Sequence, residues 1–211
     1  LWYQHRTRLH SSLLMAWLGL LVGLVAQGLL DEGALAVSLG FSTVFGGSLG
    51  VAYLLAGVTR QRVPVRAYLS LFVFGVSATV ALSMLEVPFW AVALPVALAV
   101  AAPMFHGGIR GLWAFADRLS PMGKLLHAGA IVYALHGLDF PFLREQSELA
   151  PVGFTIAILT LFALSVAGPA VVLEQVAEER VKQERLRMVQ SEFFANVSHE
   201  LRTPLTLILS P

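Results

Sequence analysis

The stretch APVGFTIAILTLFALSVAGPAVVL, residues 150–173, contains no charged side chain, and it is followed at once by EQVAEERVKQER, residues 174–185. The hydrocarbon core of a bilayer is about 30 Å thick and needs roughly 20 apolar residues of helix to cross it. Backbone polar groups in lipid must bond internally, which favours a helix. We therefore predict that residues 150–173 form a transmembrane helix, and that the chain then leaves the membrane as a charged helical segment.

The composition of the whole chain also points to a membrane protein. Of its 211 residues, 57% are hydrophobic and 13% are charged, whereas soluble domains are about 45–50% apolar and about 25% charged. A net charge of +1 suggests no nucleic-acid partner, and the absence of cysteine excludes disulfides and thiolate metal sites. The predicted fold class is all-α, a polytopic membrane helix bundle in the lipid bilayer. Six transmembrane spans are expected, at about 12–30, 34–57, 67–85, 89–105, 123–138 and 150–173.

The Lys and Arg residues orient this predicted bundle, because cytoplasmic connections carry an excess of both. Of the 14 Lys and Arg residues, all but Arg144 lie before the first span, in the second or fourth connection, or after the sixth span. Both ends of the chain are therefore expected in the cytoplasm. The chain starts at Leu1 and stops inside a helical pattern, so we expect a fragment of a longer protein. A further span before Leu1 would make seven without changing the orientation.

Small residues recur every four positions in the first two predicted spans. They are Gly19 and Gly23 in the first span, and Ser42, Gly46 and Gly50 in the second. This spacing lets two helix backbones approach closely. Packing within the chain is the favoured interpretation, and a dimer seam is the alternative.

Three histidines near the predicted membrane boundaries have roles that the sequence leaves open. His106 and His127 lie near the same interface and could form a ligand pair, although we expect no metal site. His136 lies three residues before Asp139 near the outer surface, where the two could form a pH-sensitive pair. A hydrogen-bonded interfacial histidine is the simpler interpretation.

Two connections are singled out by their composition. Residues 107–124 carry apolar side chains at helical spacing with charged residues on the remaining face, which predicts an amphipathic helix in the headgroup plane. Residues 136–148 form the longest predicted outer loop and combine aromatic, acidic and basic side chains. This loop, or the bundle cavity beneath it, is the candidate contact for an external stimulus.

The charged segment continues into a stripe of apolar residues at spacings of three and four. Such a stripe indicates one face of a continuous helix, which must be buried against something. A second copy of the helix is the simplest partner, as a parallel coiled coil. Before the stripe, Gly168-Pro169 predicts a kink that is either a hinge or a tolerated proline, and Glu178 is expected to pair with Lys182. The stripe consists of Leu186, Val189, Phe193, Val197 and Leu201.

His199 is the residue on this helix with the clearest chemical potential. At about 100° per residue it lies about 140° round the helix from the centre of the stripe, on the same face as Thr203. An imidazole with a pKa of about 6.5 keeps a neutral nitrogen lone pair at cytoplasmic pH. The neighbouring Glu200 can orient or deprotonate one ring nitrogen, which leaves the other as a nucleophile. Pro204 should bend the helix just beyond.

The stretch FFANVSHELRTPL, residues 193–205, resembles the H-box of bacterial sensor histidine kinases, with His, Glu, Leu, Arg, Thr and Pro in the family's order. The resemblance implies that His199 is autophosphorylated, that Glu200 is an acid/base neighbour, and that Thr203 supports phosphatase chemistry. Pro204 resembles the family's helix-bending proline. The resemblance also implies a homodimeric helical hairpin, an ATP-binding domain further along that uses ATP and Mg²⁺, a response-regulator receiver domain as partner, and the bacterial inner membrane as location.

Three segments are predicted on this basis. Residues 1–173 form a six-span sensor, 174–192 a cytoplasmic linker helix, and 193–211 the start of a dimerisation and phosphoacceptor domain. The predicted function is a sensor histidine kinase of a two-component phosphorelay, in which the bundle controls autophosphorylation of His199 and transfer to a response-regulator aspartate. This fragment should bind no cofactor and be inactive alone. The alternatives are a six-span transporter or channel, or a kinase-dead receptor with a dimerising cytoplasmic tail.

Overall fold

A computed structural model describes residues 11–22, 34–143, 146 and 148–209. No β-strand occurs in these ranges, so the predicted all-α fold class is confirmed for the part of the chain that they cover. A 3-10 turn, η1 (Ala116–Arg118), follows the fourth helix. The helices are the segment Ser11–Val22, α2 (Ala34–Thr59), α3 (Val65–Ser83), α4 (Phe89–Phe115), α5 (Pro121–Leu143) and α6 (Ala150–Leu209).

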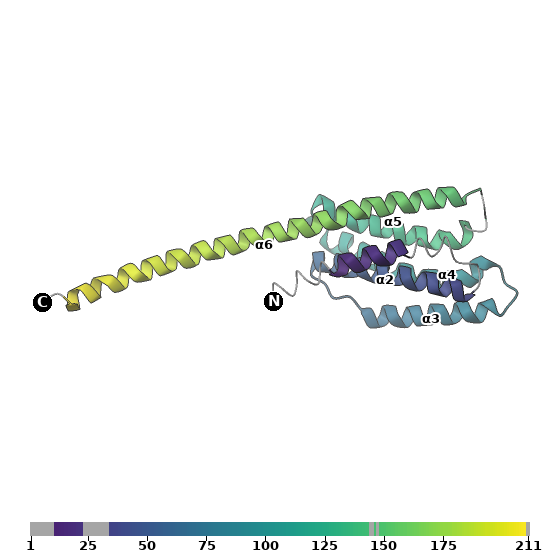
Figure 1. The fold of residues 1–211 in the computed structure, drawn as a ribbon, viewed down its shortest axis with the longest axis horizontal. Coiled ribbons are helices and arrows are strands. Elements are labelled where there is room, and N and C mark those ends of the chain that lie inside the picture. The colour runs from purple at the N-terminus through teal and green to yellow at the C-terminus, as the bar shows by residue number, and fades with distance from the viewer. Residues whose placement is uncertain (1–10, 23–33, 144–145, 147, 210–211) are drawn as a thin grey trace. The chain divides into compact units, whose positions relative to one another are not determined.

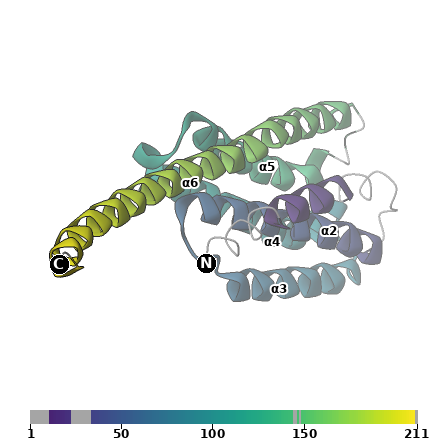
Figure 2. The ribbon, with the colours of Figure 1, turned by 60° about the vertical axis from the view of Figure 1, so that its left-hand side comes forward.

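The chain divides into two compact units, Leu1–Val172 and Leu173–Pro211. In the first unit α4 lies at the centre and packs against α2, α3 and α5 (Figures 1 and 2). The buried face of α4 is rich in alanine and valine, and small side chains let neighbouring helices approach closely. The fully buried Ser48 hydroxyl of α2 donates to the Val100 carbonyl of α4 at 2.6 Å, which gives a buried polar group its partner.

Four helices in the described ranges are long and apolar enough to cross a membrane: Gly40–Thr59, Val65–Ser83, Phe89–Arg118 and Pro151–Ser198. Only Ser11–Val22 of the first predicted span is described, and it is a shorter apolar helix. The fifth predicted span coincides with α5, a helix of 23 residues. Helix α5 contains two histidines, a lysine and an aspartate, and it is not one of these four helices. The count of six spans stays a prediction.

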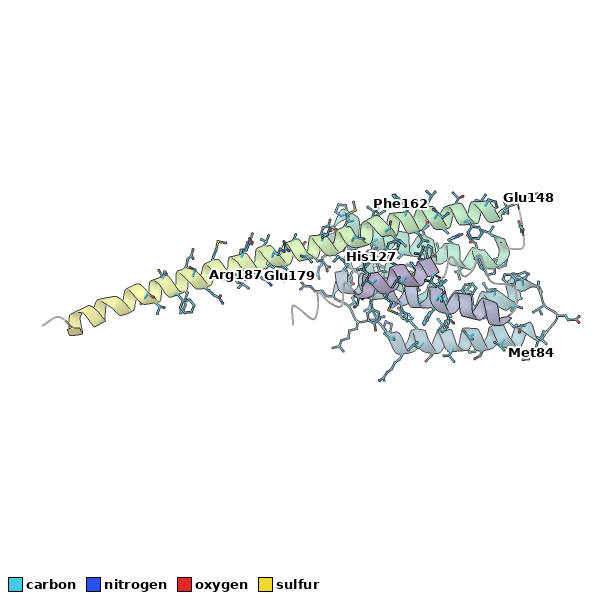
Figure 3. All side chains as sticks on the ribbon, in the orientation of Figure 1. Met84, His127, Glu148, Phe162, Glu179 and Arg187 are labelled. Carbon is cyan, nitrogen blue, oxygen red and sulfur yellow. The ribbon has the colours of Figure 1, made fainter. Side chains whose placement is uncertain are left out.

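Large apolar side chains lie on the outer surface of the first unit. On α3, Phe74 is 70% exposed and Val73 is exposed beside it; on α6, Phe162 is 67% exposed (Figure 3). Soluble monomers rarely expose apolar patches of more than a few hundred Å². This surface is compatible with a lipid environment around α3 and the first part of α6.

The predicted amphipathic helix at 107–124 is wrong in its boundaries. Residues 107–115 are the last turns of α4, and only η1 and a short connection separate them from α5. Close packing explains the continuation: the His127 ring of α5 occupies the space that a side chain at Gly111 would need. Because α5 covers this face, α4 continues as a packed helix beyond its predicted end at residue 105.

The predicted outer loop at 136–148 is wrong in the same way, because α5 stays helical to Leu143. Two aromatic contacts hold this last part of α5. Phe140 meets Phe41 edge to face with ring centroids 5.8 Å apart. Phe142 stacks on Trp90 at 5.7 Å. Contacts of this kind stabilise the helix end beyond what its local sequence suggests.

The small residues of the first two spans pack against each other within the chain, as predicted. A Cβ added at Gly47 of α2 would stand 2.5 Å from the Leu20 nitrogen, and a Cβ added at Gly19 would stand closer still to the Gly47 nitrogen. Gly46 was the wrong member of the predicted pattern, because no atom lies within 4 Å of a Cβ placed there. Gly23 lies outside the described residues.

Candidate functional site

The predicted apolar stripe, between residues 186 and 201, lies on α6, which is helical from Ala150 to Leu209. Three of its members are strongly exposed: Leu186 by 63%, Val189 by 62% and Phe193 by 62%. Val197 is half-buried, and the Leu201 side chain lies outside the described residues. A single copy of the chain therefore leaves most of this stripe open to water or to a partner.

A second apolar pair on α6 escaped the sequence reasoning. Val181 and Met188 are both exposed and lie seven residues apart, which is about two helical turns. At about 100° per residue they lie on the side of the helix roughly opposite Leu186. The sequence signal for this pair is Val181, an isolated apolar residue within a polar run.

Charged residues on this part of α6 form a local ion pair. Lys182 Nζ lies 3.3 Å from Glu179 Oε1, three residues earlier, so Glu178 was the wrong predicted partner (Figure 3 labels Glu179). An exposed pair of this kind contributes only about 0.3–0.5 kcal/mol. It supports the helix without fixing its position against any other surface.

The residues of the quoted H-box lie on the last part of α6. Glu200 is exposed. Positions 199, 203 and 204 are all helical. The predicted angle between His199 and the stripe assumes a helix, and this condition is met. The side chains of His199, Thr203 and Pro204 lie outside the described residues, so their predicted roles stay predictions.

His106 and His127 of the first unit bond to separate partners. His127 is fully buried, and its Nδ1 lies 2.7 Å from the Gly123 carbonyl oxygen within α5 (Figure 3). A carbonyl can only accept, so Nδ1 carries the hydrogen and Nε2 the lone pair. His106 Nδ1 lies 2.5 Å from the Tyr68 hydroxyl of α3. One nitrogen of the His106 ring and one of the His127 ring are therefore bonded to different protein groups, and neither bond involves a ligand shared by the two histidines.

The structure places His136 and Asp139 in contact, the arrangement that the sequence offered as the alternative to a simple interfacial histidine. His136 Nδ1 lies 2.9 Å from Asp139 Oδ1. The histidine side chain is mostly buried, and the aspartate side chain is partly exposed although its Oδ1 atom is buried. A Cβ added at Gly153 would lie 3.6 Å from the His136 ring, so the start of α6 packs beside this pair. Its pH sensitivity stays a prediction.

Residues 189–210 match the family model of the His Kinase A (phospho-acceptor) domain. The matched segment contains the H-box and the stripe from Val189 onward, and it supports a histidine kinase family and a phosphoacceptor role in two-component signalling. No curated protein and no solved structure matches the chain.

Proposed function

We propose that the protein is a membrane-embedded sensor histidine kinase of a two-component system, and that His199 is the residue that accepts phosphate. The observation that carries this proposal is the match of residues 189–210 to the phosphoacceptor family model. The exposed stripe on the same helix supports it, because phosphoacceptor helices of this family work as dimers. In this proposal residues 1–173 are the sensor, 174–192 the linker, and 193–211 the start of the phosphoacceptor domain.

The proposed reaction uses His199 as a nucleophile. A neutral ring nitrogen attacks the γ-phosphorus of ATP, a nitrogen–phosphorus bond forms, and the bond to the oxygen that bridges the β- and γ-phosphates breaks as ADP leaves. Glu200 takes the proton from the other ring nitrogen. Mg²⁺ neutralises charge on the phosphates in reactions of this type, and the resemblance assigns ATP and Mg²⁺ to a separate ATP-binding domain. The phosphoryl group then passes to a response-regulator aspartate, and Thr203 supports its hydrolysis.

Dimerisation follows from the exposed stripe in this proposal. Two copies of α6 would cover each other's Leu186, Val189 and Phe193 in a parallel coiled coil. Full burial of such a side chain contributes about 1.5–3 kcal/mol, so burying the exposed portion of each contributes roughly 1–2 kcal/mol. The dimer would bring two His199 residues to the same level along its axis.

The membrane bundle would act as the input. Helix α6 runs from Ala150 to Leu209, and its start lies beside the His136–Asp139 pair. Rotation or sliding of this helix would therefore alter how His199 is presented to the ATP-binding domain. Phosphoryl transfer depends on positioning of the reactants, so a small displacement can switch it. The protein is predicted to lie in a bacterial inner membrane with the matched segment in the cytoplasm. ATP and response regulators are found there, which agrees with the proposed reaction.

The proposal is tested by phosphorylation of the full-length protein with γ-labelled ATP. His199→Gln should abolish the label, whereas Asn196→Gln, an exposed position one turn earlier on the same helix, should keep it. The label should be lost in acid and kept in base, as a nitrogen–phosphorus bond requires. Undiminished labelling of His199→Gln would refute the proposal, and a wild type that takes no label would favour the kinase-dead receptor.

A further inference from the structure

A cationic pocket lies in the first unit between the end of α2, the 60–64 connection, the start of α3 and the end of α4. It is partly open to the outside, and the space of about 290 Å³ between its lining atoms includes open solvent. Ala52 and Ala56 of α2 are among the residues that line it. Among the described residues that line it none is acidic, and the polar or charged ones are Thr59, Gln61, Arg62, Tyr68, His106 and Arg110.

The backbone turn after α2 brings the connection to this pocket. Gln61 N donates to the Ala56 carbonyl at 2.8 Å, and Arg60 N donates to the Gly57 carbonyl at 3.3 Å. This pair of bonds is a Schellman motif, which needs a residue with positive φ, usually glycine. Here Arg60 takes that place with a φ of 56°. The turn ends α2 and directs Gln61 and Arg62 to the pocket.

A hydrogen bond between α3 and α4 holds two other lining residues, Tyr68 and His106, together. The buried Tyr68 hydroxyl of α3 lies 2.5 Å from His106 Nδ1 of α4. The Thr59 hydroxyl already donates to the Leu55 carbonyl at 3.0 Å. The donors that remain for a ligand are therefore the guanidinium groups of Arg62 and Arg110 and the amide of Gln61. Arginine is the side chain best suited to planar, bidentate recognition of phosphate.

We propose that this pocket binds a phosphate group, and that the phosphate is the headgroup of an anionic phospholipid. Arg62 lies in the connection after α2 and Arg110 in the last turns of α4. The charge pattern predicts the cytoplasmic side for both, where anionic lipid headgroups meet basic pockets between helices. Immediately beyond Tyr68, α3 exposes Leu69, Val73 and Phe74. A lipid with its phosphate on Arg62 and Arg110 could therefore lay its acyl chains along an apolar helix face, which free phosphate would not use.

Binding is tested on the purified chain in neutral detergent by native mass spectrometry, with titrations of phosphatidylglycerol, phosphatidylcholine and inorganic phosphate. One phosphatidylglycerol should bind in preference to phosphatidylcholine. Arg62→Gln with Arg110→Gln should weaken it by about a hundredfold, because a hydrogen bond to a charged group is worth roughly tenfold or more at each arginine. The matched control is Arg66→Gln with Arg118→Gln, which removes the same charge from exposed positions outside the pocket and should change binding less than about fivefold.

A second variant separates loss of the site from loss of the fold. Ala56→Phe keeps every charge but fills the pocket, and should also displace the lipid, while circular dichroism checks that each variant keeps its helices. Equal weakening in the pocket and control variants, or no weakening in either, would overturn the proposal. Binding of inorganic phosphate with no lipid preference would overturn the lipid assignment. Because binding is measured directly, the result does not depend on kinase activity.

Discussion

Replacing Gly111 with alanine is the sharpest test of the packing between α4 and α5. A methyl group at this position would overlap the His127 ring, whose Cγ would lie only 3.1 Å from the new Cβ and whose Cδ2 and Nε2 would lie closer still. Carbon atoms in contact prefer about 3.5–4.0 Å. The ring is fully buried and bonded to the Gly123 carbonyl, so it cannot move away without breaking that bond.

The expected magnitude follows from three contributions. Alanine favours a helix over glycine by up to about 1 kcal/mol. Overpacking a core costs about 1–3 kcal/mol. If the His127 ring turns away, the buried Gly123 carbonyl and the ring nitrogen lose their partner, which costs about 1–3 kcal/mol more. The net loss in the free energy of unfolding is therefore about 1–5 kcal/mol. At about 2–4 °C per kcal/mol, a central value of about 3 kcal/mol lowers Tm by roughly 6–12 °C.

The assay is thermal unfolding of the purified chain in detergent micelles, followed by circular dichroism. The matched control is Gly137→Ala in α5, where no atom lies within 4 Å of the added Cβ, so Tm should stay the same or rise by roughly 2–4 °C. In a double-mutant cycle, His127→Ala should remove the penalty of Gly111→Ala, because the ring that blocks the methyl group is gone. A rise in Tm for Gly111→Ala equal to that of the control, or full additivity in the cycle, would show that the His127 ring does not block a side chain at position 111.

Two further pairs of substitutions test the turn after α2 and the stripe on α6. At the positive-φ position, Arg60→Gly should be more stable than Arg60→Ala by about 1 kcal/mol, because only glycine is free of the left-handed penalty, and both variants lose the same side chain. Equal Tm values for the two variants would contradict this. On α6, Val189→Asp should weaken dimerisation more than about tenfold, because an unpaired carboxylate would enter an apolar interface. Ser191→Asp, exposed on another face, should leave the dimer unchanged when both are compared by sedimentation or cross-linking; equal effects would exclude the stripe as the interface.

Local patterns in the sequence predicted much of this protein. Apolar runs identified the helices. A helix long and apolar enough to span a bilayer is defined by the length and hydropathy of one continuous stretch, which can be read directly from the sequence. The spacing of Leu186, Val189 and Phe193 predicted a continuous helix with one apolar face, and the structure leaves that face exposed. The H-box at 193–205 predicted the phosphoacceptor family that the match at 189–210 supports.

Contacts between segments far apart in the chain decided the rest. Periodicity could not show that α4 continues to Phe115 and α5 to Leu143, because these helix ends are held by packing on α5, α2 and α4 rather than by their own residues. Periodicity also selected Gly46, whereas the structure packs Gly47 against Gly19 and Leu20. The face of α2 that is buried depends on where the first helix lies, which the sequence of α2 does not contain. The cationic pocket joins Arg62 to Arg110 across three helices, and only tertiary packing can bring such residues together.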